Sequence, residues 1–223
     1  MADGFFITGT DTDVGKTYVA CLLIRALRAR GLDVGVMKPV SAGGRQDAEE
    51  LMSAAGISDT PNEVNPIALA EPLSPNLAAE REGTSIDLQH ILNAYQTLSH
   101  RHETMIVEGA GGLLVPLANR LSIASLAAQF RLPLIIVSRA ALGTINHTLM
   151  TIESARARGL AIAGVIYNHT HPATGDPSEW ASPEIVARVS GIPSLGTLPH
   201  ADAVDVVQVE HCLSMKRIME YLQ

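Results

Sequence analysis

One segment near the N-terminus has the residue types and spacing of a phosphate-binding loop. Residues 9–17 read Gly-Thr-Asp-Thr-Asp-Val-Gly-Lys-Thr; they follow an apolar run and open an amphipathic stretch, as such a loop requires. Backbone N–H groups and a helix N-terminus would offer partial positive charge to phosphate oxygens. Lys16 would pair with the β and γ phosphates, and the Thr17 hydroxyl would bind Mg²⁺. The segment therefore predicts a nucleotide-binding site.

This loop departs from the common P-loop motif in one respect. Five residues separate Gly9 from Gly15, where the motif has four, and Thr10 stands at the usual first-glycine position. The structural alternative is a strand–turn–helix junction that carries Gly-Lys-Thr by chance. The apolar run before the loop and the amphipathic stretch after it favour the phosphate-binding interpretation.

Glu108 is a second candidate for chemistry. It follows the apolar run 104–107 and precedes Gly109-Ala-Gly-Gly112. Ligands of open α/β sheets bind at the carboxyl ends of the strands, so a carboxylate there is poised for a metal. A Glu108 bonded to neighbouring backbone N–H groups, and a simple tight turn at the glycines, are the structural alternatives.

Apolar runs that alternate with amphipathic stretches predict the elements that position these residues. We expect strands at 5–8, 34–38, 104–107, 134–137, 161–167 and 194–198. We expect helices at 16–30, 47–55, 86–101, 122–130, 144–158, 184–189 and 207–222. This alternation predicts an α/β fold with a mostly parallel sheet and helices on both faces. Together with the phosphate-binding loop, it predicts a single P-loop, nucleotide-binding domain over residues 1–223.

The proline-rich segment 60–83 is the longest stretch without a predicted element. Long loops of compact domains are often functional, although a surface excursion without function is an equal alternative.

Composition restricts the class of protein. The chain has 223 residues, of which 47% are hydrophobic and 4% aromatic, and its formal net charge is −7. The acidic balance argues against non-specific nucleic-acid binding, but it permits a local basic pocket. Without a signal peptide or about 18 consecutive apolar residues, we expect no membrane span and a cytoplasmic protein. Cys21 and Cys212 are interpreted as small apolar residues rather than a disulfide or a zinc site.

Four motifs in one order resemble the dethiobiotin synthetase family, the ATP-dependent carboxylases of biotin synthesis. They are the loop 9–17, Lys38-Pro-Val40, Val107-Glu-Gly-Ala-Gly-Gly112 and Leu142-Gly-Thr-Ile-Asn-His147. The resemblance covers roughly residues 5–200, and the five-residue loop spacing is the family's own.

The resemblance implies a reaction. CO₂ carbamylates one amine of 7,8-diaminononanoate, and the carbamate oxygen takes the γ-phosphoryl group of ATP. The second amine attacks this mixed anhydride and closes the cyclic urea of dethiobiotin, with release of ADP and phosphate. ATP is thus the co-substrate and Mg²⁺ the cofactor.

The resemblance also implies roles for residues of this sequence. Lys38 and Lys16 would be catalytic, since a cation beside the carbamate and γ-phosphate offsets negative charge. The Mg²⁺ ligands would be Thr17, Asp47 and Glu108, although Asp47 also stands where a helix N-cap belongs. The nucleotide would contact Asp13, Val14, Gly15, Lys16, Thr17, Tyr18, Asp47, Glu108, Gly109, Ala110, Gly111, Asn168, His169, Pro199, His200 and Ala201.

Within that set Asn168 would read the adenine edge, for which an amide is suited, while a turn-forming Asn is its structural alternative. The substrate would contact Thr12, Ser41, Ala42, Gly143, Thr144 and Asn146. Family members commonly have Ser or Thr four residues after the lysine, where this chain has Ala42. Either Ser41 or backbone groups of Ala42 and Gly43 would then make that contact.

The segment Gly143–Asn146 resembles the part of the family fold that meets the substrate carboxylate near a dimer interface. We therefore expect a homodimer in which a second copy completes each site. His169, His171 and His200 have no cysteine neighbours and lie in loops, and we expect no metal site there.

Other P-loop proteins fit less well. Switch or partitioning ATPases have a signature lysine where this chain has Asp11, and Gly-Gly where it has Thr12-Asp13. Amide-forming enzymes of cobalamin synthesis, which also activate a carboxyl group with ATP, usually carry a glutaminase domain, for which 223 residues leave no room. Guanine-specific switches would have an Asn-Lys-x-Asp element, and Asn168-His-Thr-His171 is not one.

Overall fold

The computed structural model describes residues 3–118, 120–201 and 205–222. Its centre is a six-stranded sheet in the order β10-β9-β8-β1-β5-β2. The strands are β1 (Asp3–Gly9), β2 (Val34–Met37), β5 (Thr104–Gly112), β8 (Leu134–Arg139), β9 (Ile162–Asn168) and β10 (Ser194–Leu198). Every pairing in this sheet is parallel, which confirms the predicted fold class.

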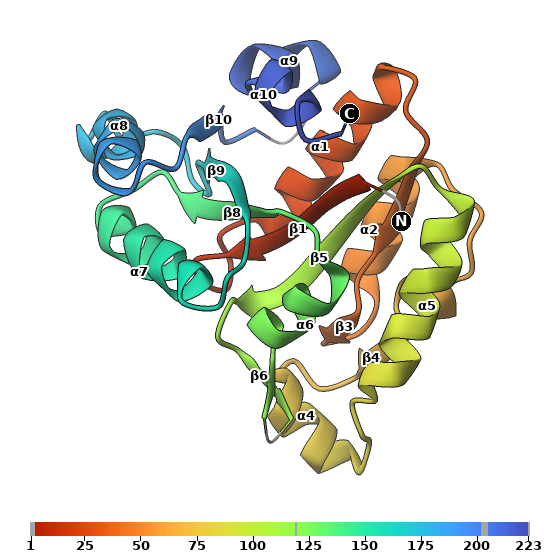
Figure 1. Ribbon diagram of the computed structural model, residues 1–223. Coiled ribbons are helices and arrows are strands. Elements are labelled where there is room, and N and C mark those ends of the chain that lie inside the picture. Colours follow the sequence, from red (N-terminus) through yellow and green to blue (C-terminus); the bar gives the residue numbers. More distant parts are fainter. Residues whose placement is uncertain (1–2, 119, 202–204, 223) are drawn as a thin grey trace.

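Helices cover both faces of the sheet (Figure 1). They include α1 (Lys16–Ala29), α2 (Gln46–Ala55), α5 (Leu88–Arg101), α6 (Ile123–Phe130), α7 (Thr144–Arg156) and α8 (Ser178–Ser190). Figure 1 shows α6 in front of the sheet and α1 and α2 behind it. Because both faces are covered, the strands are continuously apolar: Phe5, Phe6 and Ile7 of β1 are fully buried.

The strand order positions the site. β1 lies between β5 and β8, and β5 lies between β1 and β2. In a parallel sheet the carboxyl ends share one edge. The loop after β1, Lys38 after β2 and Glu108 of β5 are therefore brought to the same edge from distant parts of the sequence.

The segment 60–83 is not irregular, so that prediction is wrong. It contains α3 (Pro61–Val64), β4 (Ile67–Leu69) and α4 (Pro75–Glu82), and β4 pairs in parallel with β3 (Val40–Ala42). Pro61 and Pro75 stand in the first turns of the helices, where a missing N–H costs nothing. Two of the four prolines that resembled a loop signature, Pro61 and Pro75, thus begin helices, while Pro66 and Pro72 lie between elements.

The glycine-rich segment 109–112 is also not a turn, because β5 continues through it to Gly112. Close packing explains the small residues: a Cβ at Gly109 would lie 3.0 Å from the Phe6 ring and 3.1 Å from Ile123. Two short strands beyond it, β6 (Pro116–Ala118) and β7 (Leu121–Ser122), form an antiparallel pair.

Two helices also differ from the expected bounds. α8 begins at Ser178 rather than near residue 184. The prediction began too late because Pro183, which lies inside this helix, interrupts the helical pattern of the sequence. The tail is two helices, α9 (Val206–Cys212) and α10 (Met215–Met219), and Leu213 between them bridges to Gly196. Within the described residues, no helix has the length and apolar character to cross a membrane.

Candidate active site at the carboxyl edge of the sheet

The phosphate-binding loop connects β1 to α1 through two residues with left-handed backbone. Asp13 has φ +55° and Gly15 has φ +83°. A Cβ at Gly15 would lie 2.2 Å from Asn168 Nδ2, so only glycine fits there. α1 begins directly after Gly15, at Lys16. Its unpaired first-turn N–H groups therefore face the carboxyl edge, as anion binding requires.

Lys16 is a buried cation in this loop. Its Nζ donates to the Asp11 carbonyl at 3.2 Å, and the residue is 7% exposed. Burial and the charge of Lys38 lower the pKa of Lys16, against the opposing attraction of Glu108, Asp47 and Asp13. An anionic ligand would relieve both unfavourable effects.

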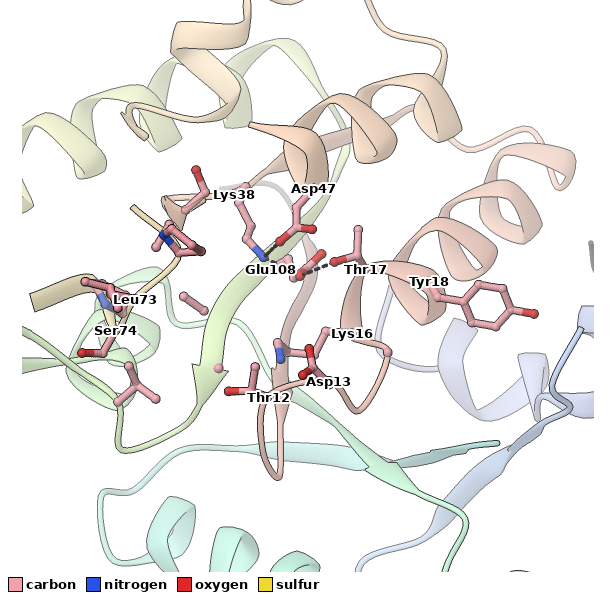
Figure 2. Close-up of a pocket in the computed structure, with 18 residues that line it drawn as sticks. Thr12, Asp13, Lys16, Thr17, Tyr18, Lys38, Asp47, Leu73, Ser74 and Glu108 are labelled. Atoms are coloured by element: carbon pink, nitrogen blue, oxygen red, sulfur yellow. Dashed lines mark hydrogen bonds and ion pairs between the residues drawn. The ribbon is translucent and has the colours of Figure 1, made fainter. Parts of the chain in front are cut away.

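Lys38 lies between two carboxylates. Its Nζ is 2.6 Å from Glu108 Oε1 and 2.6 Å from Asp47 Oδ2, and it also donates to the Gly109 carbonyl at 3.4 Å. Thr17 donates its hydroxyl to the same Glu108 oxygen at 2.9 Å. Figure 2 shows these side chains turned toward one another. We call Thr17, Lys38, Asp47 and Glu108 the charged cluster.

The charges of this cluster depend on one another. Burial of Lys38 opposes its positive charge, but attraction to Glu108 and Asp47 outweighs burial and raises the pKa of Lys38. Burial likewise opposes ionisation of Asp47, yet the charge of Lys38 and its hydrogen bond to Asp47 hold the pKa of Asp47 below the ordinary range. Lys38 is therefore a permanent cation and Asp47 a permanent anion at neutral pH.

The oxygen atoms of the cluster suit a hard divalent cation. Asp47 supplies a carboxylate, Thr17 a hydroxyl and Glu108 a second carboxylate, whose Oε2 is buried without a hydrogen-bond partner. In the part of the chain that the structure describes, no three His, Cys, Asp or Glu side chains gather as a metal-binding group. The charged cluster instead offers two carboxylates and a hydroxyl. Mg²⁺ typically binds one or two protein carboxylates and completes its coordination with water and phosphate oxygens.

A cavity of about 700 Å³ opens over the cluster. Its lining includes Thr12, Asp13, Gly15, Tyr18, Ser41, Ala42, Ala110 and Gly111, together with Lys16 and the four residues of the cluster. Residues from three of the four predicted motifs, together with Ser41, Ala42 and Asp47, therefore surround one space. Such a volume is typical of a site for small molecules.

Part of the cavity wall was not predicted. Pro72, Leu73, Ser74, Pro75 and Val115 also line it. The first four precede or begin α4, and Figure 2 shows Leu73 and Ser74 on the side of the charged cluster opposite Tyr18. The length and proline content of 60–83 were the available signal for this wall, since long loops of compact domains are often functional.

The predicted base-binding residues lie at the ends of β9 and β10. Asn168 ends β9, is 2% exposed and donates from Nδ2 to the Val14 carbonyl at 3.1 Å, while its Oδ1 is buried without a partner. His169 follows and donates its backbone N–H to Leu198. Pro199, His200 and Ala201 follow β10, and Ala201 accepts a hydrogen bond from the Tyr18 hydroxyl at 3.4 Å.

The segment 143–146 does not line the cavity over the charged cluster. Gly143 caps α7 with φ +91°, and the buried Thr144 hydroxyl contacts those of Ser138 and Thr148. Asn146 points outward, with Nδ2 4.0 Å from Met150 Sδ. Within one chain these three predicted substrate contacts are therefore separated from the others.

Comparisons with known proteins agree with this geometry. Residues 3–208 match the family described as an AAA domain. The septum site-determining protein MinD of Pyrococcus horikoshii, solved with Mg-ADP, superposes with a TM-score of 0.56 at 17% identity, covering 99% of this chain and 90% of that one. Fold, loop and cavity together define a nucleotide-binding α/β protein of the P-loop class.

Sequence relatives identify the family within that class. ATP-dependent dethiobiotin synthetase BioD of Anaeromyxobacter dehalogenans is 46% identical over 200 residues, covering 88% of this chain and 89% of the relative. The protein of that name from Bacillus licheniformis is 38% identical over 215 residues, covering 94% and 91%. The chain belongs to the ATP-dependent dethiobiotin synthetase family.

Proposed function

We propose that this ATP-dependent ligase converts 7,8-diaminononanoate, CO₂ and ATP into dethiobiotin, ADP and phosphate through a carbamate and a carbamic-phosphoric anhydride. The observation that carries the mechanism is the position of Lys38, held 2.6 Å from both Asp47 and Glu108 beside the phosphate-binding loop. A fixed cation in a buried site stabilises charge that develops on a carbamate and a transferring phosphoryl group.

The loop would hold the triphosphate of ATP. N–H groups of residues 13–18 and the ammonium of Lys16 offer donors to its oxygens, and phosphate would replace the Asp11 carbonyl as the partner of Lys16. The adenine would lie between the ends of β9 and β10, where the unpartnered Oδ1 of Asn168 and the segment Pro199–Ala201 are placed. The preference for ATP is inferred from the relatives, which are ATP-dependent dethiobiotin synthetases.

Mg²⁺ would be held by Thr17, Asp47 and Glu108, whose oxygen atoms fit this ion. When bound it supplies positive charge that neutralises the β and γ phosphates. Lys38, released from one carboxylate, would then direct its ammonium toward the carbamate oxygen that accepts the phosphoryl group. Phosphoryl transfer depends on positioning and charge more than on covalent chemistry with the protein, and this cluster provides both.

A second copy of the chain would complete the substrate site. An apolar surface beside the loop contains Leu114, 56% exposed, and Met150, 53% exposed. They line a hollow between the end of β5 and α7 whose rim includes Thr12, a residue of the catalytic cavity as well. Two copies meeting there would bring residues 143–146 of one chain toward the cavity of the other. The helix N-terminus at Gly143 would receive the substrate carboxylate.

Turnover of the purified protein tests the proposal. ATP, Mg²⁺, bicarbonate and the diamino acid are supplied, and the cyclic urea is sought by mass spectrometry alongside phosphate release. We expect phosphate and ureido product in equal amounts. ATP hydrolysis without diamine-dependent product would contradict the reaction.

Localisation in the cytoplasm stays a prediction from the sequence.

A further inference from the structure

Asn65 is a fully buried polar residue that lies between α3 and β4. Its Nδ2 donates to the carbonyl oxygens of Lys38 at 2.7 Å and Ile67 at 3.1 Å. Its Oδ1 accepts the hydroxyl proton of Ser41 at 2.9 Å. All of its side-chain hydrogen bonds therefore go to β4 and to the segment that carries Lys38 and Ser41.

Residues 64 and 65 together hydrogen-bond both the backbone N–H and the backbone carbonyl of Lys38. The Lys38 N–H donates to the Val64 carbonyl at 2.8 Å, while the Lys38 carbonyl accepts from Asn65. Both backbone polar groups of the catalytic lysine are thus fixed by two adjacent residues. Such support limits how far the backbone beneath the ammonium can shift.

The contacts of Asn65 fix the direction of its amide. The carbonyls of Lys38 and Ile67 only accept hydrogen bonds, so they must face the amide NH₂ group. The amide oxygen then faces Ser41, which must donate its single proton to it. Toward any other partner, Ser41 Oγ offers lone pairs alone.

Ser41 lines the catalytic cavity although it is only 3% exposed. The neighbouring wall is largely apolar: Ala42, Pro72, Leu73 and Pro75 line the same cavity, and a Cβ at Gly43 would lie 3.2 Å from Pro72. An aliphatic chain fits such a wall. Carboxylate, carbamate and phosphate oxygens have no proton to offer an acceptor at neutral pH, whereas an amine nitrogen has.

We propose that Ser41 accepts a hydrogen bond from a nitrogen of the diamine, and that Asn65 is the positioning residue that gives Ser41 this polarity. The inference rests on the proposed function and adds which substrate group Ser41 recognises. Family members commonly have Ser or Thr at the position of Ala42. In this chain the hydroxyl of Ser41, one residue earlier, would make that contact instead.

Substrate binding to the full-length protein tests this polarity. Calorimetry measures the affinity for 7,8-diaminononanoate with Mg²⁺ and a non-hydrolysable ATP analogue present. Ser41→Ala should weaken diamine binding about tenfold, the loss typical of one hydrogen bond. Its affinity for nonanoate, which lacks both amines, and for the ATP analogue should stay within about twofold of wild type. The two monoamino analogues then show which nitrogen is bound, because the Ser41→Ala loss should persist with only one of them.

Asn65→Leu tests the positioning role. It frees the Ser41 proton, so diamine binding should weaken by about the same factor as in Ser41→Ala, and the double variant should show little further loss. Asn93→Leu, at an exposed position of α5, is the matched control and should bind as wild type does. Circular dichroism and thermal melting establish that each variant is folded; if Asn65→Leu is not, Ser41→Ala alone decides.

The outcomes separate the two proposals. If the wild-type protein binds the diamine and Ser41→Ala binds it equally well, the inference is overturned and the proposed function still stands. Equal losses for nonanoate and the diamine, or additive losses in the double variant, also overturn it, since they indicate a general structural effect. A wild-type protein that neither binds nor converts the diamine contradicts the proposed function itself.

Discussion

Lys38 and Glu108 form an ion pair at the carboxyl edge of the sheet in which neither partner is appreciably exposed: their side chains are 3% and 0% accessible. Burying one such charge alone is strongly unfavourable, so each residue requires the other. The pair links the end of β2 to β5 directly beside the phosphate-binding loop. This arrangement makes Lys38 both a stabilising element and the proposed catalytic cation.

Lys38→Ala should reduce turnover at least about a hundredfold, because the transition-state charge loses its cation. Nucleotide binding should weaken by less than about tenfold, since the loop and Lys16 remain. Loss of the partner also leaves Glu108 buried and unpaired, so thermal unfolding should occur at a lower temperature. Steady-state kinetics, nucleotide titration and calorimetry measure these effects. Lys216→Ala, on the exposed face of α10, is the control, and a Lys38 variant with the control's turnover would contradict the assignment.

Thr17→Val should raise the Mg²⁺ concentration for half-maximal turnover about tenfold or more, because it removes a predicted ligand without changing the side-chain shape much. Thr17→Ser keeps the hydroxyl that donates to Glu108 and should titrate close to wild type. Magnesium titrations at saturating ATP distinguish the two. Overlapping curves for the valine and serine variants would remove Thr17 from the ligand set.

Gly15→Ala should abolish detectable nucleotide binding, because its Cβ would collide with Asn168 and its φ of +83° is strained for alanine. Gly31→Ala has nearly the same φ, +85°, with nothing within 4 Å of the new Cβ. It should lose about 1 kcal/mol of stability through strain and keep its nucleotide affinity. Equal affinity in both variants would show that the contact between Gly15 and Asn168 is unimportant.

His102→Gln should alter how stability depends on pH. His102 Nδ1 is 3.0 Å from Asp33 and Nε2 is 2.9 Å from Asp59; Arg28 and Arg101 face these carboxylates. Burial opposes the charged imidazole, but the hydrogen bonds to Asp59 and Asp33 outweigh it and raise the pKa of His102. Since the folded pKa lies above the unfolded value of about 6.5, this stabilisation is complete below that pH and is lost as pH rises through the folded pKa.

Urea unfolding from about pH 6 to pH 9 measures the effect. The free energy of unfolding should be larger for wild type than for His102→Gln near pH 6, and this difference should decrease as the pH rises toward about 9. The exposed His90 supplies the control, and His90→Gln should follow the wild-type profile. A constant difference between wild type and His102→Gln across this range would show that folding does not raise the pKa of His102.

Met150→Glu should convert the proposed dimer to monomers and lower turnover, because a charge would enter an apolar contact. Light scattering during size exclusion gives the mass. Trp180→Glu changes an apolar residue of α8 that is even more exposed, 72% accessible, and should leave the mass unchanged. A fully active monomeric variant would refute the idea that residues 143–146 act across an interface.

Buried strands were the part of the fold most readily predicted. β1, β2, β8 and β9 are mostly apolar and buried because helices cover both faces of the sheet, and these runs indicate the order of strands and helices. Lys38 and Glu108 were predicted for the same reason: each stands at the end of such a run, where parallel strands place side chains at one edge.

Other features depend on tertiary context that the sequence does not display. The prolines of 60–83 were interpreted as loop residues because a helix-starting proline looks the same as a helix-breaking one. Asn65 carried no signal, since its importance comes from hydrogen bonds to residues 27 and 24 positions away. Residues 143–146 do not line the cavity of their own chain, and their proposed role requires a second copy, which no motif of the sequence displays.

The two carboxylates around Lys38 differ in their accessibility to solvent. Glu108 lies within β5, hydrogen-bonded on both sides by β1 and β2, and is inaccessible to water. Asp47 stands in the first turn of α2, and its side chain is 46% accessible. Solvent therefore reaches the ammonium from the Asp47 side, and a ligand that approaches Lys38 from there would meet the Asp47 carboxylate before that of Glu108.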